Sequence, residues 1–530
     1  MKRKQTIMMA IKYCYFIVIM CLGAYTKRDI VLGVEGILEL CTIFILSNML
    51  FNISKTVARA VNFLLLLFYG IEITVLKLGG SFVTPIMLTN ISSLSALSGK
   101  TLSYVLHVVL FLLALLIPLE KVEISHGILS RKRISISLMG INMAVVTTLG
   151  SSPLTSALLL GNTMYQMRKM SEERNRQQNT ITITDQSSKY YSSTIGDYRE
   201  SEFEELPDVL IIFTEGLSQN IIDDSRNIMP NVREYQNRSL TFENYYNHTA
   251  ATYRGLIGQL YSGHQYENTD TNAFISLQAI MSSYGYETTF INPEPNNEEF
   301  SAYLCSMGFD QVISADCADW MSDRETYHMI YESLIEETDN PKLISVYTFG
   351  THVSMDRSEY QFGDGTDHVL NRFHNVDYYF GELMEKIASN PDLENTLVVF
   401  TTDHATYVDE DFLKAFADFY SRDDSFCDEI PLFFYYSGIT PEKMDVGGRN
   451  SLDAAPTILD YLDMDGENYF LGDSLFSPRK DSISIDMIHS IPNQGWYVST
   501  YDGMICELTD EEQQLFIPEI IEYTNLANYK

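Results

Sequence analysis

Hydrophobic residues are arranged differently in the first third of the chain and in the rest. Five long apolar segments occupy residues 8–24, 30–51, 57–76, 102–119 and 134–149. Each approaches the length of about 20 residues that a helix needs to cross a bilayer. No small-residue cleavage site follows the first segment, so we expect an anchor rather than a removed signal peptide. The pattern predicts a membrane domain of five helices.

Shorter apolar runs follow from residue 208 onward. Runs typical of buried strands lie at 209–213, 288–291, 343–349, 397–401 and 432–436, and helical patterns such as 274–284 and 369–389 lie between them. Strands that alternate with helices favour βαβ units, in which helices cover a mostly parallel sheet. We therefore predict an α/β/α fold with a mostly parallel sheet for this part.

A polar segment at 171–207 separates the two patterns and shows little apolar periodicity. Such a composition is typical of a linker or of a segment that follows the protein surface. We divide the chain into a five-span transmembrane domain at 1–155, a linker at 156–206 and an α/β domain at 207–530.

The charge balance changes at the same place. Residues 1–170 contain 16 Lys and Arg against 6 Asp and Glu, whereas the remaining residues contain 20 against 64. Basic clusters at 2–4, 55–59 and 131–133 indicate cytoplasmic ends, so an odd number of spans places the chain after about residue 150 outside the cytoplasm. The acidic second part argues against nucleic acid as a partner.

Three glutamates, Glu35, Glu39 and Glu72, fall in or near the apolar segments. A charge inside a bilayer is costly and is often functional. Positions near span ends, or pairs with Lys12, would explain these residues equally well, so both interpretations stay open.

Four of the seven cysteines, Cys305, Cys317, Cys427 and Cys506, belong to the second part. Disulfides are permitted outside the cytoplasm, but pairing cannot be deduced from sequence. Cys305 with Cys317 is the local candidate, and a bridge or two free thiols are equally compatible with the sequence.

Candidate metal ligands stand where two predicted strands end. The run NTLVVFTTDHA ends in Asp403 and His404, and DVLIIFTEG ends in Glu215. Ligands of open α/β sheets bind beyond the carboxyl ends of the strands, so we expect these three side chains at one sheet edge. A single glutamate after a strand is more commonly a helix cap or a surface group.

A candidate nucleophile lies in NHTAATYRGLIGQLYSG, where Thr252 precedes a helical pattern. As an N-cap, its hydroxyl would satisfy free backbone N–H groups, which is a structural role. The same position suits a nucleophile, because the helix dipole and a nearby cation both favour the alkoxide. Arg254 is a candidate for holding an anionic oxygen of the substrate.

Histidines supply further candidates. FGTHVSM places His352 near the same sheet edge, as a contact to phosphate or as a general acid or base, although isolated histidines are usually structural. His368 and His374 lie in the next helical pattern and are weaker candidates, since His374 also suits simple packing on its helix.

The four residues Glu215, Thr252, Asp403 and His404 offer three oxygens and one nitrogen. This hard-to-borderline set suits Zn²⁺ or Mn²⁺, with Mg²⁺ left open.

The order of these motifs is similar to that of the alkaline-phosphatase/sulfatase superfamily, in the branch of lipoteichoic acid synthases and phosphoethanolamine transferases. The matching motifs are FTEG, T-x-R-G-L, GTH, NTLVVFTTDH, EIPLFFYYSG and SLDAAPTILDYLDMDGENYFLGDSLF. ADWMSDRETY also resembles a W-x-x-(S/D)-D segment of the synthases. Five preceding spans match the architecture of that branch.

The resemblance implies a role for each matching residue. Glu215, Asp403 and His404 would bind one divalent metal, Thr252 would be the metal-bound nucleophile that becomes a phospho-threonine, and His352 would contact the phosphoryl group. The donor would be a phospholipid, phosphatidylglycerol or phosphatidylethanolamine. The acceptor would be a surface glycan, a glycolipid or a teichoic acid, so we expect a transferase of the cell membrane with its catalytic domain on the outer side.

Departures from the family pattern leave the substrate open. Sulfatases carry C-x-P-S-R or S-x-P-S-R where this chain reads TAATYR, which argues against sulfate-ester hydrolysis. Thr249 competes with Thr252 as the nucleophile, and Ala405 replaces the usual glycine. Arg357 and His374 are candidates for contacts that other residues make to glycerol phosphate in the synthases.

Two other functions remain compatible with the motifs. A phosphatase, phosphodiesterase or sulfatase would use water as the final acceptor. A non-catalytic module that binds lipid or glycan would be expected to have lost metal ligands, whereas all four candidates are present.

Overall fold

The structure of the protein is a computed structural model that forms two compact units. The helical unit comprises Met1–Met170 and Val408–Tyr420, and the sheet unit comprises Ser171–Tyr407 and Ser421–Lys530. The structure describes residues 2–27, 29–79, 82–83, 101–121, 140, 152–158, 160–161, 189–265, 272–317, 320–353, 355, 358–416, 426–478, 482–491 and 495–528.

Apolar helices form the helical unit. They are α1 (Lys2–Thr26), α2 (Ile30–Leu50), α3 (Lys55–Gly79) and α5 (Thr101–Leu116), and the short α16 (Glu410–Ala415) belongs to the same unit. Three segments, Thr6–Thr26, Ile30–Leu50 and Lys55–Leu78, are long and apolar enough to cross a membrane. The described residues therefore support a membrane anchor.

The five predicted spans are reduced to three candidates. The apolar part of α5, Tyr104–Leu116, is shorter than a span. The helix ends two residues before Pro118, because a proline disfavours the helical conformation of the residue that precedes it. The fifth predicted segment, 134–149, lies outside the described residues except for residue 140. The orientation that depended on five spans stays a prediction.

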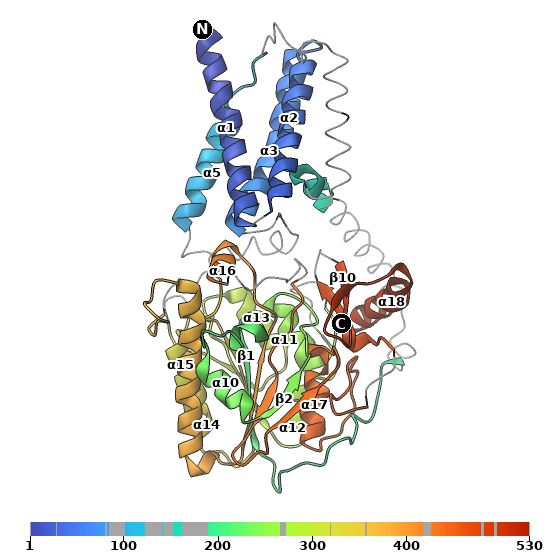
Figure 1. Ribbon diagram of the computed structural model, residues 1–530. Helices are drawn as coiled ribbons and strands as arrows, with labels where there is room; N and C mark the ends of the chain where they lie inside the picture. The colour runs from blue at the N-terminus through green and yellow to red at the C-terminus, as the bar shows by residue number, and fades with distance from the viewer. Residues whose placement is uncertain are drawn as a thin grey trace. The chain divides into compact units, whose positions relative to one another are not determined.

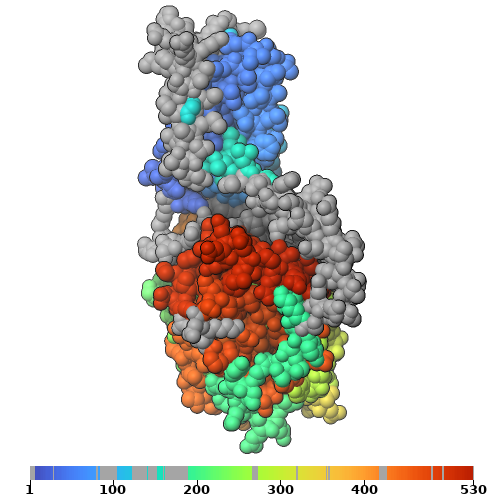
Figure 2. Space-filling model, turned by 90° about the vertical axis from the view of Figure 1, so that its right-hand side faces the viewer, coloured from blue at the N-terminus to red at the C-terminus, as the bar shows by residue number. Residues whose placement is uncertain are grey.

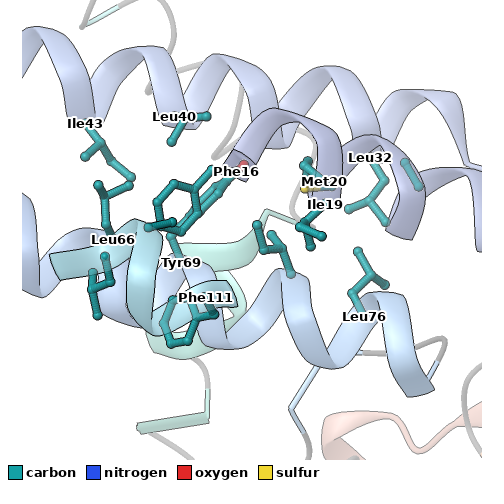
Figure 3. Packing of buried hydrophobic residues seen from close by; sticks show 14 residues of the cluster. Phe16, Ile19, Met20, Leu32, Leu40, Ile43, Leu66, Tyr69, Leu76 and Phe111 are labelled. Carbon is teal, nitrogen blue, oxygen red and sulfur yellow. The ribbon is translucent and has the colours of Figure 1, made fainter. Parts of the chain in front are cut away.

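Aromatic and aliphatic side chains pack between the four helices (Figure 3). Phe16 and Met20 of α1, Leu40 of α2, Tyr69 of α3 and Phe111 of α5 belong to one buried cluster. The rings of Phe16 and Phe111 meet edge to face with their centroids 6.3 Å apart. Such interlocking fixes the helix positions more tightly than apolar burial alone, because aromatic edges and faces attract one another.

The glutamates of the apolar segments are buried, and two of them accept hydrogen bonds from groups other than Lys12. Glu39 accepts hydrogen bonds from Ser152 Oγ at 2.8 Å and from the Leu154 N–H at 3.0 Å. Glu72 accepts one from the Val83 N–H at 2.8 Å. The Lys12 ammonium instead donates to Asn62 Oδ1 at 3.0 Å. Lys12 is therefore not the hydrogen-bond partner described for Glu39 or for Glu72.

One large sheet organises the sheet unit (Figure 1). Its order is β4-β3-β5-β1-β6-β7-β2-β8. The strands are β1 (Asp208–Thr214), β2 (Leu240–Glu243), β3 (Glu287–Ile291), β4 (Gln311–Ile313), β5 (Lys342–Thr348), β6 (Thr396–Thr402), β7 (Phe433–Tyr435) and β8 (Glu442–Asp445). Only β7 runs antiparallel to its neighbours among these described strands. The predicted α/β fold with a mostly parallel sheet is confirmed.

Helices cover both faces of this sheet. They are α9 (Gln219–Ile222), α10 (Pro230–Asn237), α11 (Thr252–Tyr261), α12 (Leu277–Ser283), α13 (Glu298–Ser306), α14 (Asp323–Ile335), α15 (His368–Ser389) and α17 (Ala454–Tyr461). In Figure 1, α10, α14 and α15 lie on one side of the sheet, and α11, α12 and α17 on the other. The result is a three-layer arrangement.

A second, antiparallel sheet follows, which the sequence pattern did not predict. Its strands are β9 (Ile488–Ile491), β10 (Gly495–Ser499) and β11 (Ile505–Glu507), and α18 (Asp510–Ala527) comes next. Figure 2 shows this C-terminal region gathered on one face of the sheet unit. The described part of the predicted linker packs on the same unit, since Tyr190 contacts Tyr523 edge to face at 5.4 Å.

All seven cysteines lie in described parts of the chain and are free thiols. Cys305 is exposed near the end of α13, and Cys317 is half-buried. The bridge between them that the sequence left open is therefore not formed.

The central strands are buried on both faces, which explains their uninterrupted apolar runs. Phe400 of β6 is fully buried, stacks on Phe433 at 4.9 Å and meets Phe380 of α15 at 5.1 Å. Removing this ring leaves a cavity that β-strand neighbours cannot fill, because they are held by the sheet.

We therefore expect Phe400→Ala to lower the free energy of unfolding of the sheet unit by about 3–5 kcal/mol. Urea denaturation of the full chain in detergent, followed by tyrosine and tryptophan fluorescence, measures this loss. Leu515→Ala on α18 is the control, because that side chain is 64% exposed and should change little. An equal loss in both variants would contradict the assignment of Phe400 to the core.

Candidate metal-dependent active site

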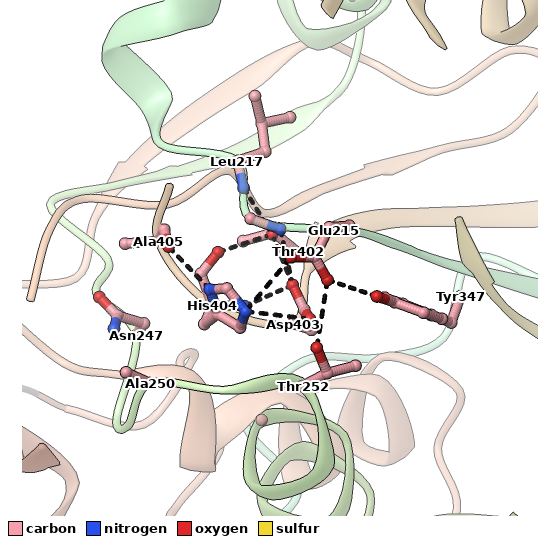
Figure 4. Close-up of polar contacts among 12 residues, drawn as sticks. Glu215, Leu217, Asn247, Ala250, Thr252, Tyr347, Thr402, Asp403, His404 and Ala405 are labelled. Carbon is pink, nitrogen blue, oxygen red and sulfur yellow. Dashed lines mark hydrogen bonds and ion pairs between the residues drawn. The ribbon is translucent and has the colours of Figure 1, made fainter. Parts of the chain in front are cut away.

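The parallel register of β1 and β6 places three candidate ligands together (Figure 4). Thr214 pairs with Thr402, so Glu215 and Asp403 leave the sheet side by side. One ligand atom from each of Glu215, Asp403 and His404 lies within 4.8 Å of the others. All three side chains are buried, with exposures of 5%, 0% and 8%.

Asp403 presents one oxygen to the backbone and the other to the site. Its Oδ1 accepts hydrogen bonds from the N–H groups of Gly216 and His404, both at 2.8 Å. Its Oδ2 is buried and has no hydrogen-bond donor within the described part of the chain. An orphaned carboxylate oxygen is costly unless a cation occupies the space before it, so this oxygen fits a metal ligand.

The imidazole of His404 is oriented for the same purpose. Its Nδ1 donates to the Ala405 carbonyl at 2.7 Å, so Nδ1 carries the proton and the lone pair is on Nε2. Nε2 lies 3.4 Å from Asp403 Oδ2 and 3.6 Å from Glu215 Oε1. A backbone carbonyl that fixes the tautomer in this way is typical of histidines that bind metals.

Glu215 links these ligands to two hydroxyl groups. Its Oε2 accepts hydrogen bonds from Tyr347 and, at 3.1 Å, from Thr252 Oγ1. Burial raises the pKa of Glu215, and repulsion from Asp403 raises it further. Two buried carboxylates at this distance need a counter-charge, which a divalent ion bound to both would supply.

Thr252 is the first residue of α11 and not its N-cap, which corrects the prediction. The cap position is held by Ala251, whose φ of 82° turns the chain sharply before the helix. The Thr252 hydroxyl is therefore free of the capping role and donates to Glu215. A Cβ at Gly255 would lie 2.1 Å from the Asp403 carbonyl oxygen, so glycine there lets α11 approach the ligand strand closely.

Thr249, the competing nucleophile, faces a different part of the molecule. Its hydroxyl is buried and donates to the Ser490 carbonyl of β9 at 2.8 Å. The structure thus joins Thr252, and not Thr249, to the three ligands.

His352 lies four residues after β5, the strand on the other side of β1. Its ring stacks on Phe349 with centroids 4.8 Å apart. Burial lowers its pKa, while the charge of Glu215 opposes that change. A neutral imidazole near the cluster can donate one hydrogen bond to a phosphoryl oxygen.

The cation near His352 is Arg372, which sequence reasoning missed. Its Nη1 donates to the His352 carbonyl at 3.2 Å, and its charge helps to lower the His352 pKa. Arg372 lies on the apolar face of α15, one turn from Val369 and Val376, and is 2% exposed. An arginine within an apolar helical stripe was the signal that could have revealed it.

Arg254 and His374 are among the remaining predicted residues that the structure describes. Arg254 is buried, and its charge reaches Tyr303 and His248. His374 bonds through Nδ1 to the Ile228 carbonyl at 2.8 Å and packs on Phe362, as expected of a structural histidine. Arg357 lies outside the described residues.

Two further residues near the cluster carried no motif. Tyr347 is the last residue but one of β5 and is buried, and a buried tyrosine in a strand usually signals only core packing. Glu294 lies three residues after the end of β3. Its charge raises the pKa of Tyr253 and that of Tyr347, the tyrosine that donates to Glu215. Burial raises the pKa of Glu294 to about 7.

Removing the Tyr347 hydroxyl tests whether it orients the metal ligand. We expect Tyr347→Phe to weaken divalent-metal binding by about 10- to 100-fold, the usual effect of losing a hydrogen bond to a ligand. Calorimetric metal titration of the full chain in detergent measures it. Tyr261→Phe is the control, since its hydroxyl donates to the Met307 carbonyl at 2.8 Å on another helix face. Unchanged affinity in Tyr347→Phe would contradict the role.

Glu294 should make stability depend on pH. Its native pKa of about 7 exceeds the ordinary 4.5, so the native state retains a proton that the unfolded state releases. Stability from this group is therefore present below the unfolded pKa and is lost as pH rises through the native pKa. We expect the Tm of Glu294→Gln, relative to wild type, to increase between about pH 5 and about pH 8. A difference that is constant with pH would contradict this.

Comparison with known proteins agrees with this site. Residues 207–464 match the family model described as Sulfatase. Among solved structures, an alkaline-phosphatase-superfamily protein from Vibrio parahaemolyticus is 17% identical, with a TM-score of 0.49 over 63% of this chain and 88% of that one. Lipoteichoic acid synthase LtaP from Listeria monocytogenes is 15% identical, with a TM-score of 0.49 over 66% and 97%.

The periplasmic domain of EptC from Escherichia coli is 14% identical, with a TM-score of 0.42 over 58% of this chain and 94% of that one. No protein of the curated set matches the sequence. At these sequence identities, the solved structures do not indicate which substrate the protein uses. The stretch that matches the Sulfatase model contains Glu215, Thr252, Asp403 and His404, so the family similarity and the ligand cluster fall in the same part of the chain.

Proposed function

We propose that the protein is a membrane-anchored, metal-dependent phosphotransferase. It moves a phospho-headgroup, glycerol phosphate or phosphoethanolamine, from a phospholipid to a hydroxyl of a cell-surface glycan, glycolipid or teichoic acid. The observation that carries the proposal is the hydrogen bond from Thr252 Oγ1 to Glu215 within the cluster of Glu215, Asp403 and His404. A hydroxyl at that place is a nucleophile next to its proton acceptor and next to a cation site.

The reaction proceeds in two displacements. In the first, Thr252 Oγ1 forms a bond to phosphorus while the bond from phosphorus to the diacylglycerol oxygen breaks. The Thr252 proton passes to Glu215 Oε2, which already accepts it as a hydrogen bond, and from there to the diacylglycerol oxygen, so diacylglycerol leaves as the alcohol. In the second, the acceptor oxygen forms a bond to phosphorus while the bond from phosphorus to Thr252 Oγ1 breaks, and the proton of the acceptor hydroxyl returns to Thr252 Oγ1 by way of Glu215. The phospho-threonine is thus made and consumed in each cycle.

A divalent ion held by Glu215, Asp403 and His404, Zn²⁺ or Mn²⁺ with Mg²⁺ as a further option, would stabilise negative charge on the nucleophilic oxygen and on the phosphoryl group. His352 donates a hydrogen bond to the group in transfer. Its lowered pKa keeps the ring neutral, so it does not add a second charge that would hold the phosphorylated state too tightly.

The apolar helices of the helical unit support a lipid donor. Thr6–Thr26, Ile30–Leu50 and Lys55–Leu78 can each cross a bilayer, so the chain is anchored where its donor is dissolved. We place the sheet unit on the outer side of a multi-pass anchor, because basic residues cluster at 2–4 and 55–59 and the sheet unit is acidic.

Hydrolysis of a phosphate or sulfate ester is the second candidate, because the matching family model is that of sulfatases. It uses the same site, with water in place of the acceptor hydroxyl. The segment TAATYR has no cysteine or serine at the position of the sulfatase nucleophile, which favours phosphorus over sulfur as the reacting atom.

Mass spectrometry tests the first displacement directly. We expect the full chain, incubated with phosphatidylglycerol or phosphatidylethanolamine vesicles and divalent metal, to gain the mass of one phospho-headgroup on the peptide that contains Thr249 and Thr252. The mass gained identifies the headgroup. Thr252→Ala should abolish the adduct, and Thr249→Ala, the matched control, should keep it, because the Thr249 hydroxyl faces β9.

The same incubation separates transfer from hydrolysis. Diacylglycerol release beyond one equivalent per protein that requires an added glycan or glycolipid acceptor supports transfer, whereas continued release of free headgroup phosphate without an acceptor supports hydrolysis. An adduct that persists in Thr252→Ala would refute Thr252 as the nucleophile.

A further inference from the structure

The loop that carries His352 is tied down by a pair of buried polar side chains from two helices. Asp323 is the first residue of α14 and Asn375 lies in α15, and they are 7% and 4% exposed. The Asn375 Nδ2 group donates to Asp323 Oδ2 at 2.6 Å. Neither residue is used by the proposed chemistry, yet burying both is expensive unless they satisfy other polar groups.

Asp323 holds the start of the loop. The N–H of Gly350 donates to its carboxylate, two residues before His352. The approach is so close that a Cβ at Gly350 would lie 1.9 Å from Asp323 Oδ1, so only glycine fits. Position at the N-terminal end of α14 also stabilises the carboxylate, because the helix dipole is positive there.

Asn375 holds the end of the loop. Its Oδ1 accepts hydrogen bonds from the N–H groups of Glu359 and Tyr360, both at 2.9 Å. Two donors to the amide oxygen fix its orientation, so the amide nitrogen must face Asp323. A carboxylate there accepts that hydrogen bond, and no donor could replace it.

The middle of the loop is held against the metal-ligand cluster. The Thr351 hydroxyl donates to the carbonyl of Glu215, and the His352 carbonyl accepts from Arg372 Nη1 at 3.2 Å. Gly350 is thus bound to Asp323, Thr351 to Glu215, and His352 to Arg372. Because these three residues are consecutive, a shift of Gly350 would move His352 relative to Glu215.

We infer that Asp323 is a positioning residue for phosphoryl transfer: through Gly350 and Asn375 it fixes the loop that brings His352 to the phosphoryl group. The inference rests on the proposed function, because the role of His352 belongs to that function. Asp323 itself touches neither the metal ligands nor the site of Thr252 in the described contacts, so its effect on the reaction is indirect.

The test is the rate of headgroup adduct formation on Thr252 in the full chain with phospholipid vesicles and metal. Asp323→Asn places an amide donor against either the Gly350 N–H or the Asn375 amide nitrogen. We expect the rate to fall about 10- to 100-fold, as for a misplacement of a reacting group by about 1 Å. The amount of bound metal should not change, because Glu215, Asp403 and His404 are intact.

A double variant provides the rescue. In Asp323→Asn with Asn375→Asp, the new amide at 323 donates to the new carboxylate at 375, which still accepts from Glu359 and Tyr360. Donors and acceptors are complementary again, although the negative charge has moved from residue 323 to residue 375. We therefore expect the rate to return to within about threefold of wild type. A role limited to bulk stability would not produce this pattern at temperatures well below the Tm of every variant.

Asp377→Asn is the matched control. Asp377 lies on the same helix as Asn375, is fully buried, and accepts from the N–H groups of Asn231 and Val232 at 3.1 and 2.8 Å. It holds α10 and makes no contact with the His352 loop among its described contacts. Both single aspartate variants should lower the Tm, but only Asp323→Asn should slow the adduct.

Hydrogen exchange makes the outcome independent of activity. Asp323→Asn should accelerate exchange at 349–353, and Asp377→Asn should accelerate it in α10. Equal adduct rates in wild type and Asp323→Asn, or unchanged exchange at 349–353, would overturn the inference. If wild type itself forms no adduct, the proposed function fails, and exchange at 349–353 still decides whether Asp323 anchors the loop.

Discussion

The parallel alignment of β1 between β5 and β6 is the constraint on which the site depends. Thr214 pairs with Thr348 on one side and with Thr402 on the other, so three chain segments leave the sheet at the same level. Glu215, His352 and the pair Asp403 and His404 follow those three strand ends. A shift of one residue in either pairing would turn alternate side chains to the other face and dissolve the cluster.

That alignment concentrates negative charge where water is scarce. Glu215 and Asp403 are both buried, and the pKa of Glu215 is raised by burial and by its neighbour. The apolar strands stabilise the fold strongly enough to bear this repulsion, which a cation would relieve. The burial of β1, β5 and β6 therefore offsets the unfavourable electrostatic energy of the site, as is usual for binding sites on rigid scaffolds.

Most of the large sheet and all three residues of the ligand cluster were predictable from sequence, because periodicity and strand ends report backbone position. Val209 and Leu397 belong to apolar runs that became β1 and β6, and Glu215 and Asp403 follow from them. Tyr347, Arg372 and Asp323 were not predictable, since their roles depend on which helix faces which loop. The N-cap assignment of Thr252 failed because a turn with positive φ at Ala251 starts the helix at Thr252 itself, one residue earlier than a cap at Thr252 would require.

Ala251 gives that turn a further meaning. Its φ of 82° and ψ of 137° belong to a region that glycine enters freely and alanine enters at a cost of about 1–3 kcal/mol. A glycine would remove the cost, but it would also let the peptide before Thr252 rotate, and each turnover would have to order the threonine again. The alanine methyl group restricts this rotation, so the entropy of ordering Thr252 is lost once, during folding. The orientation of the Thr252 hydroxyl toward Glu215 is thus set by the fold before any ligand binds.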